Sequence, residues 1–142
     1  MRITFSSQNV SFSLKKKSAV KKILLSVIKK EKKKTGNISF TFCNDPFLLA
    51  LNKKFLKHHT LTDIITFDYS SPATHPSSLA AEIFISISRV KENAKKFKIS
   101  FENELHRIMI HGILHLCGYS DKTGAKKKEM RKMEDYYLNC FE

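Results

Sequence analysis

The chain has 142 residues, 42% of them hydrophobic, which is enough for one domain with a packed core and excludes an intrinsically disordered protein. Its 26 basic and 13 acidic residues give a net charge of +13, so a polyanion such as nucleic acid is the expected partner, ahead of an anionic membrane surface. The three cysteines are scattered and form no Cys-x-x-Cys pair, which excludes a disulfide framework. No apolar run approaches the roughly 20 residues of a membrane span. We therefore expect a cytoplasmic protein.

Hydrophobic periodicity predicts strands where apolar and polar residues alternate, and helices where apolar residues recur every three or four positions. In chain order, the expected elements are strands at 2–5 and 10–14, a helix from Ser18 that Gly36 closes, a strand at 38–43, a helix that Asp45 caps and that runs to about 55–57, a strand at 62–67, a loop at 70–78, a strand at 82–88, a helix at 89–97, a helix from its cap Ser100 to about Cys117, and a last helix from Thr123. Strands interleaved with helices predict an α+β fold, an α/β sandwich whose small mixed sheet of about four strands packs with helices. No linker or repeat divides the chain, so residues 1–142 are expected to form a single domain.

Lysine accounts for most of the positive charge: of 26 basic residues, four are arginine, which leaves 22 lysines. Ten of these lysines lie in or beside the first predicted helix. They form either a solvated helix face or a surface that contacts phosphates. An AT-rich genome, which enriches surfaces in lysine, would also explain the charge, so the composition alone leaves both interpretations open.

The most informative segment is His111-Gly-Ile-Leu-His115-Leu-Cys-Gly-Tyr-Ser-Asp121. Two histidines four residues apart share one face of a helix, with Cβ atoms roughly 5–6 Å apart, so they can bind one metal ion. Gly118 ends the helix and lets the chain turn back, which allows Asp121 to supply a third ligand. Three protein ligands with an open fourth position are typical of catalytic zinc, so we predict a metal-dependent hydrolase rather than a pair of core histidines.

The glycine inside this motif, Gly112, bears on which bond the predicted hydrolase cleaves. Zinc proteases of the His-Glu-x-x-His type carry a general base directly after the first histidine, where this chain has Gly112. Peptide hydrolysis is therefore disfavoured, whereas a metal that acidifies water and polarises a phosphoryl oxygen remains possible. Because a helical glycine costs about 1 kcal/mol relative to alanine, we expect another element to pack closely against Gly112. The helix is apolar around the motif, so both histidines are expected in a sheltered site.

The histidine motif resembles the signature of the YbeY family, bacterial rRNA maturation factors described as single-domain, metal-dependent endoribonucleases. The resemblance extends to Leu51-Asn52 and Phe55, to Leu61-Thr-Asp-Ile-Ile-Thr-Phe67 and to Ala81-Glu-Ile83, and thus covers about Asn44 to the C-terminus. It implies a single-strand-specific endoribonuclease that acts in 16S rRNA 3′-end maturation and ribosome biogenesis. Its implied partners are single-stranded rRNA and the ribosomal subunit, with one divalent metal, zinc first, and no membrane or small-molecule cofactor.

Three positions depart from the family pattern. Asp121 stands where the third histidine is usual; a carboxylate is a competent ligand, so His111, His115 and Asp121 remain the expected metal ligands, although this set also suits iron or manganese. Leu56 stands where an arginine is usual, so Lys57, His58 or His59 would have to replace it. Leu61 replaces a proline.

Two alternatives stay open from the sequence. Asp63 either holds a ligating histidine through its second ring nitrogen or is a turn residue. The loss of the arginine at position 56 also supports a second function, that of a non-catalytic factor in ribosome assembly that binds rRNA or ribosomal protein and carries a structural metal.

Overall fold

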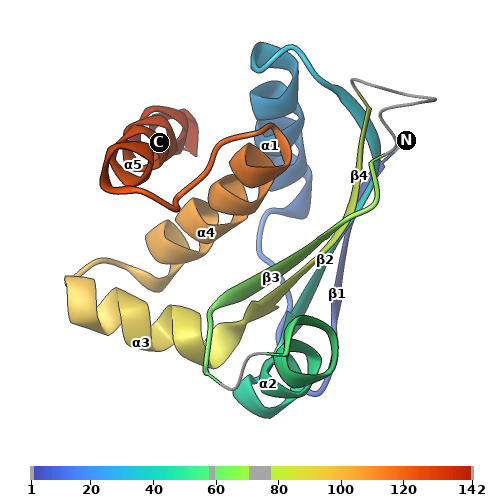
Figure 1. Cartoon of the computed structure of the whole chain (residues 1–142), viewed down its shortest axis with the longest axis vertical. Helices are drawn as coiled ribbons and strands as arrows, with labels where there is room; N and C mark the ends of the chain where they lie inside the picture. Colours follow the sequence, from blue (N-terminus) through green and yellow to red (C-terminus); the bar gives the residue numbers. More distant parts are fainter. Residues whose placement is uncertain (1, 58–59, 71–77, 142) are drawn as a thin grey trace.

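The computed structural model describes residues 2–57, 60–70 and 78–141, and it consists of a four-stranded sheet with helices packed on it (Figure 1). The elements in chain order are β1 (Arg2–Ser7), α1 (Lys17–Lys30), β2 (Lys34–Cys43), α2 (Asp45–Leu51), the π-helical turn η1 (Asn52–Leu56), β3 (Ile64–Asp68), β4 (Ser78–Ser86), α3 (Ile87–Phe97), α4 (Phe101–Leu116), α5 (Gly124–Leu138) and the 3₁₀ turn η2 (Asn139–Phe141). Among the described helices, none is long and apolar enough to cross a membrane.

The sheet is mixed, as predicted. Its strand order is β1-β2-β4-β3; β1, β2 and β4 are parallel, and β3 is antiparallel to β4. The parallel pairs are joined through α1 and, more distantly, through the segment that contains α2 and β3. The α+β fold class predicted from the sequence is therefore confirmed.

Two apolar clusters lie on opposite faces of this sheet. The larger one joins the side chains of Ile38, Phe40 and Phe42 in β2 to the buried stripes of α1 and α4. The smaller one places Leu48 of α2 against Cys43 and Ile65. Helix α4 thus lies between the sheet and α5 (Figure 1), so it can carry side chains into a space bounded by both.

The predictions for the first 43 residues are correct for β1, for the start of α1 and for β2, but two of them are wrong. Residues 10–14 form no strand: Asn9 adopts a left-handed backbone (φ 61°), and the following segment serves as a connection in which Phe12 packs edge-on against Phe42. Gly36 does not close α1, which ends at Lys30; it lies inside β2, at an irregularity in the pairing with β4.

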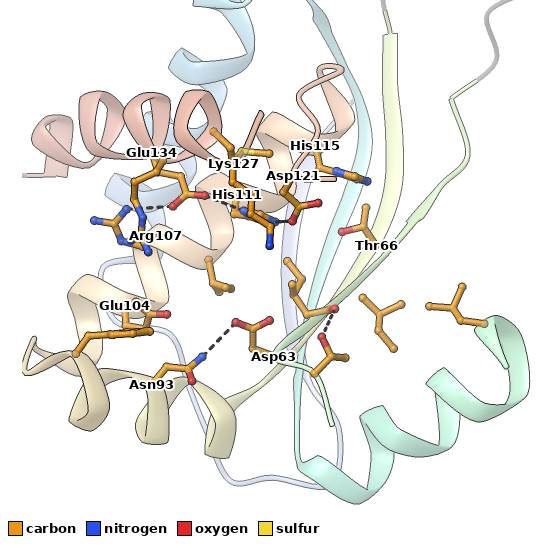
Figure 2. A pocket seen from close by; sticks show the side chains of 18 residues that line it. Asp63, Thr66, Asn93, Glu104, Arg107, His111, His115, Asp121, Lys127 and Glu134 are labelled. Atoms are coloured by element: carbon orange, nitrogen blue, oxygen red, sulfur yellow. Dashed lines mark hydrogen bonds and ion pairs between the residues drawn. The ribbon is translucent and has the colours of Figure 1, made fainter. Parts of the chain in front are cut away.

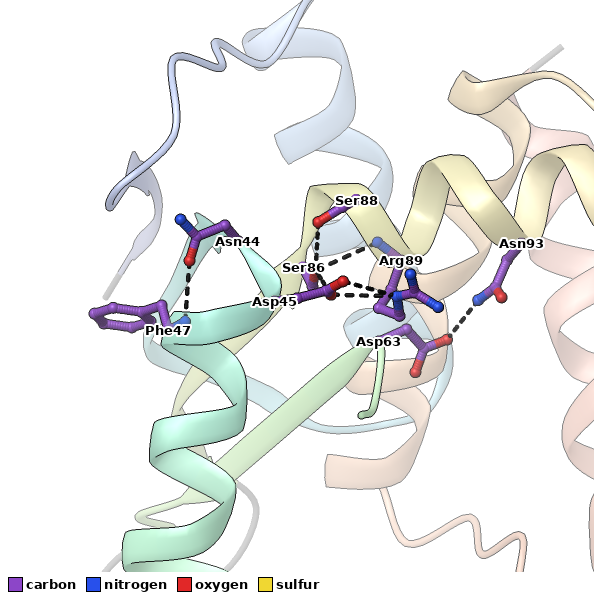
Figure 3. Close-up of polar contacts among 8 residues, drawn as sticks. All are labelled: Asn44, Asp45, Phe47, Asp63, Ser86, Ser88, Arg89 and Asn93. Atoms are coloured by element: carbon purple, nitrogen blue, oxygen red, sulfur yellow. Dashed lines mark hydrogen bonds and ion pairs between the residues drawn. The ribbon is translucent and has the colours of Figure 1, made fainter. Parts of the chain in front are cut away.

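The junction between the sheet and the helices is held by one polar cluster (Figure 3). Asn44, not Asp45, caps α2, because its side chain accepts a hydrogen bond from the backbone N–H of Phe47. Asp45 instead accepts hydrogen bonds from the Ser86 hydroxyl (2.6 Å) and from Arg89 Nε (3.1 Å). Ser86 also caps α3, so β4 ends at Ser86 and not at residue 88 as predicted. This cluster fixes α3 against the end of the sheet.

The remaining elements agree with the sequence analysis within a few residues. Ser100 and Thr123 cap α4 and α5, and Gly118 follows α4 with a left-handed backbone (φ 107°). The predicted loop at 70–78 lies largely outside the described residues, which resume at Ser78.

Replacing Gly36 by alanine should destabilise the fold by about 1–3 kcal/mol, the usual cost of overpacking. A Cβ atom at this position would lie 2.6 Å from the carbonyl oxygen of Leu79, so β2 and β4 would have to separate. Gly124→Ala is the matched control: nothing lies within 4 Å of its added Cβ, and it should be neutral or stabilising by up to about 1 kcal/mol. Urea unfolding measures both; equal midpoints for Gly36→Ala and the parent chain would contradict the packing described here.

Candidate active site

An open cleft of about 630 Å³ runs between α4, α5 and the β3 end of the sheet. Its lining includes all three predicted ligands, His111, His115 and Asp121, together with Asp63 from the segment before β3. Such a volume is in the range of ligand-binding pockets. Arg107 and His111 of α4 and Glu134 of α5, which form the polar contacts between these two helices, also line the cleft.

His111 is held from both of its ring nitrogens (Figure 2). Its Nδ1 lies 2.8 Å from Glu134 Oε2, and its Nε2 lies 3.6 Å from Asp121 Oδ2. Burial alone would lower the pKa of His111, but the hydrogen bond to Glu134 and the charges of Glu134, Asp121 and Asp63 outweigh it and raise the pKa above its usual value. The ring is therefore oriented by Glu134 and faces a carboxylate on its other side.

Glu134 is the site residue that sequence reasoning missed. It is 5% exposed, and its second oxygen accepts a hydrogen bond from Arg107 (3.0 Å), which also pairs with Asp135 (2.7 Å). The only signal in the sequence is its place in the last predicted helix, one residue after Met133 and four after Met130, which lie on the inward stripe. A buried carboxylate on a histidine's second nitrogen is the arrangement that orients metal-binding and general-base histidines.

His115 occupies a different environment. It lines the same cleft one turn after His111, but it is exposed to solvent, which corrects the expectation that both histidines are sheltered. Across residues 2–57, 60–70 and 78–141, no group of three or more His, Cys, Asp or Glu side chains is arranged to hold a metal ion. The structure thus brings His111 and Asp121 together and places His115 beside them, without closing the three into one ligand set.

Asp63 does not hold a histidine ring. Its Oδ2 accepts a hydrogen bond from Asn93 Nδ2 (3.2 Å), and its carbonyl oxygen accepts the backbone N–H of Ser86 (2.9 Å). It lies just before β3, on the wall of the cleft (Figure 2). Burial raises the pKa of this carboxyl group, and the charge of His111 only partly offsets that effect.

Close packing explains the glycine inside the motif. A Cβ atom at Gly112 would lie 3.1 Å from Cδ1 of Ile64 and 3.3 Å from Cδ1 of Ile83, so the absence of a side chain lets α4 approach β3 and β4. The predicted close contact is therefore confirmed. It sets the depth at which His111 enters the cleft.

The loop that carries Asp121 is attached to α1 through tyrosines. Glu31, at the C-terminal end of α1, accepts hydrogen bonds from the hydroxyls of Tyr119 (3.0 Å) and Tyr137. Burial, with the adjacent Glu31 carboxylate, raises the pKa of Tyr119 to about 12. Both tyrosines therefore remain hydrogen-bond donors, and they hold the loop and α5 in position.

Comparison with known proteins places this chain in a family. The family model described as Endoribonuclease YbeY matches residues 2–142. The chain belongs to the YbeY endoribonuclease family. It is 45% identical to Endoribonuclease YbeY of Flavobacterium psychrophilum, over 93% of this chain and 91% of that one, and 45% identical to that of Flavobacterium johnsoniae, over 92% and 91%. A solution structure of a protein from Thermotoga maritima has the same fold, with a TM-score of 0.66 and 27% identity over 97% of this chain and 87% of that one.

The cleft of this YbeY-family protein is also lined by positively charged side chains. Leu56, at the position where an arginine was expected, lines the cleft, whereas Lys57 is exposed and does not; residues 58 and 59 lie outside the described part. Lys127 and Arg131 line the cleft from successive turns of α5, and neither forms an ion pair with another described residue. Positive charge at this YbeY site is therefore supplied from α5 rather than from position 56.

Proposed function

We propose that this protein is a single-strand-specific, metal-dependent endoribonuclease that acts in the cytoplasm on the 3′ end of 16S rRNA during ribosome biogenesis. Family membership supports endoribonuclease activity. The observation that carries the proposal is His111, which Glu134 orients from behind and which faces Asp121 across an open cleft. The cleft is open to solvent, as a strand that passes through it requires, whereas the enclosed sites of small-molecule enzymes bury most of their ligand.

The donor set suits a divalent metal, zinc first. His111 and His115 offer imidazole nitrogens and Asp121 offers a carboxylate, the ligand types of catalytic zinc sites, and the Glu134 contact leaves His111 Nε2 as the ring nitrogen directed at the cleft. When bound, such an ion supplies Lewis acidity for phosphodiester hydrolysis. The role of the three residues is to hold it at the wall of the cleft, and that of Glu134 is to fix the ring of His111.

The two cations of α5 that line the cleft are suited to bind the RNA backbone. Lys127 and Arg131 lie four residues apart, so their side chains follow one face of the helix beside His111 and Asp121. Lysine and arginine contacts to phosphates position a strand without reading its sequence, and they weaken as the salt concentration rises. We assign these two residues to the strand that enters the cleft.

Replacing Asp121 by alanine should lower the metal content per chain from about one equivalent to well below that, because only two of the three proposed ligands remain, and RNA cleavage should fall with it. Mass spectrometry on untagged protein and cleavage of a single-stranded 16S 3′-end RNA measure the two effects, and circular dichroism confirms the fold. Retained cleavage in Asp121→Ala would contradict the proposed ligand set. A folded parent chain with RNA binding but no cleavage would favour the second function, a ribosome-assembly factor.

A further inference from the structure

The cleft has a second polar end, away from His111 and Asp121 (Figure 2). There, Glu104 of α4 lies near Asp63, which is hydrogen-bonded to Asn93 of α3. Glu104 is 3% exposed, yet it lines the cleft and makes no hydrogen bond to any described residue. The carboxyl group of Asp63 also receives the backbone N–H groups of its own residue and of Ile64.

Glu104 makes no hydrogen bond within the described residues and lines the cleft, so its carboxylate is available to a donor on a ligand that enters there. Burial raises the pKa of Glu104; Arg107 and Arg131 lower it, whereas Asp63 and Glu134 raise it further. The cationic neighbours do not remove the need for a donor, since Arg107 directs its terminal nitrogens to Glu134 and Asp135. A ligand that brings N–H groups to this end of the cleft would supply the donor that Glu104 lacks.

The cleft also has an apolar part to its lining. Leu56, Phe97, Ile108 and Met130 are among the residues that line it. Proteins read unpaired RNA bases with this combination, in which apolar or aromatic side chains cover the faces of the base and polar groups meet its Watson–Crick edge. Guanine presents two adjacent N–H donors on that edge, which match one carboxylate, whereas uracil presents a single one.

We propose that Asp63, Asn93 and Glu104 form a nucleobase pocket that prefers guanine in the nucleotide next to the cleaved phosphate. This proposal rests on the proposed function for its substrate class, because the base enters as part of a single-stranded RNA. Glu104 accepts the N1 and N2 hydrogens of the base, and Asp63 and Asn93 complete the polar wall. The pocket is a specificity determinant and takes no part in bond cleavage.

The test uses the four 5′-nucleoside monophosphates as probes, with binding measured by calorimetry, so that it needs no catalysis. We expect 5′-GMP to bind about tenfold or more tightly than 5′-UMP, which corresponds to one well-formed pair of base contacts. In Glu104→Gln the affinity for 5′-GMP should fall about tenfold while that for 5′-UMP stays unchanged, since one of two acceptors becomes a donor. Glu102→Gln is the matched control: it alters an exposed glutamate of the same helix that does not line this cleft, and it should change neither affinity.

Two outcomes would contradict the proposed guanine pocket, and two others separate it from the proposed function. Equal affinities of the four nucleotides for the parent chain would show that phosphate alone drives binding, and this result decides the question even if Glu104→Gln fails to fold. Displacement of 5′-GMP by Mg²⁺, with Mg²⁺ binding lost in Glu104→Gln, would assign the acids to a cation instead. Guanine preference without RNA cleavage would refute the proposed function and leave the pocket standing, whereas cleavage of oligonucleotides irrespective of their bases would do the reverse.

Discussion

His111→Ala should reduce RNA cleavage on the order of 10³-fold or more, the size of effect seen when one member of a catalytic unit is removed. His111 contacts an acidic residue at each of its ring nitrogens: Glu134 holds Nδ1, and Asp121 faces Nε2. Without the ring, the proposed ligand set loses its oriented member, and Asp121 and His115 remain on an exposed rim. Initial cleavage rates on a single-stranded RNA measure the effect.

The matched control for this variant is His106→Ala. His106 lies on the same helix, but it stacks on Phe141 (4.1 Å between ring centroids) and lines a different cavity. It should leave the cleavage rate nearly unchanged at a temperature where both variants are folded. If both histidine variants lost activity equally, the loss would reflect the stability of α4, and the assignment of His111 to the site would fail.

Glu134→Gln should lower cleavage by about 10- to 100-fold, the usual cost of removing the carboxylate that orients a metal-binding histidine. The amide cannot hold the imidazole as the carboxylate does, and it also weakens the pair with Arg107, so we expect a loss of stability of about 1–3 kcal/mol. The pKa of His111 should fall, because the hydrogen bond and charge of Glu134 are the causes that raise it. NMR titration of the His111 ring in metal-free protein distinguishes this positioning role from simple destabilisation.

Asp135→Asn provides the comparison for Glu134→Gln. Asp135 pairs with the same arginine but is exposed, and no contact joins it to the ring of His111. An exposed ion pair contributes roughly 0–1 kcal/mol, so stability should change little and both cleavage and the pKa of His111 should be retained. A similar loss of cleavage in the two variants would show that Arg107, rather than the orientation of His111, is what Glu134 provides.

Position 56 carries no positive charge in this cleft. Leu56 adds an apolar side chain to the wall, and the cations come from Lys127 and Arg131 on α5. Helix α5 carries both these cations and Glu134, the partner of His111, and Tyr137 attaches the same helix to Glu31. The stability of α5 on α4 is therefore a condition for both phosphate binding and the orientation of His111.

The sequence by itself determined the features that depend on local interactions. The apolar stripe from Val20 to Ile28 predicted α1, and caps such as Ser100 and Thr123 placed the starts of α4 and α5, because a helix is specified by contacts three and four residues apart. The same spacing put His111 and His115 on one helix face, and Gly112 indicated close packing. The mixed sheet followed from the order of these elements.

Only the tertiary structure decided which side chains meet across elements. Glu134 is 23 residues from His111 in the chain, and nothing local distinguishes it from other acids; it becomes the partner of His111 because α5 packs on α4. Alternation at residues 10–14 is as regular as in a true strand, but the chain turns at Asn9 and these residues pair with none of the described strands. The exposure of His115 and the burial of Glu104 likewise depend on where α3 and α5 lie, since burial is a property of packing between elements rather than of helical periodicity.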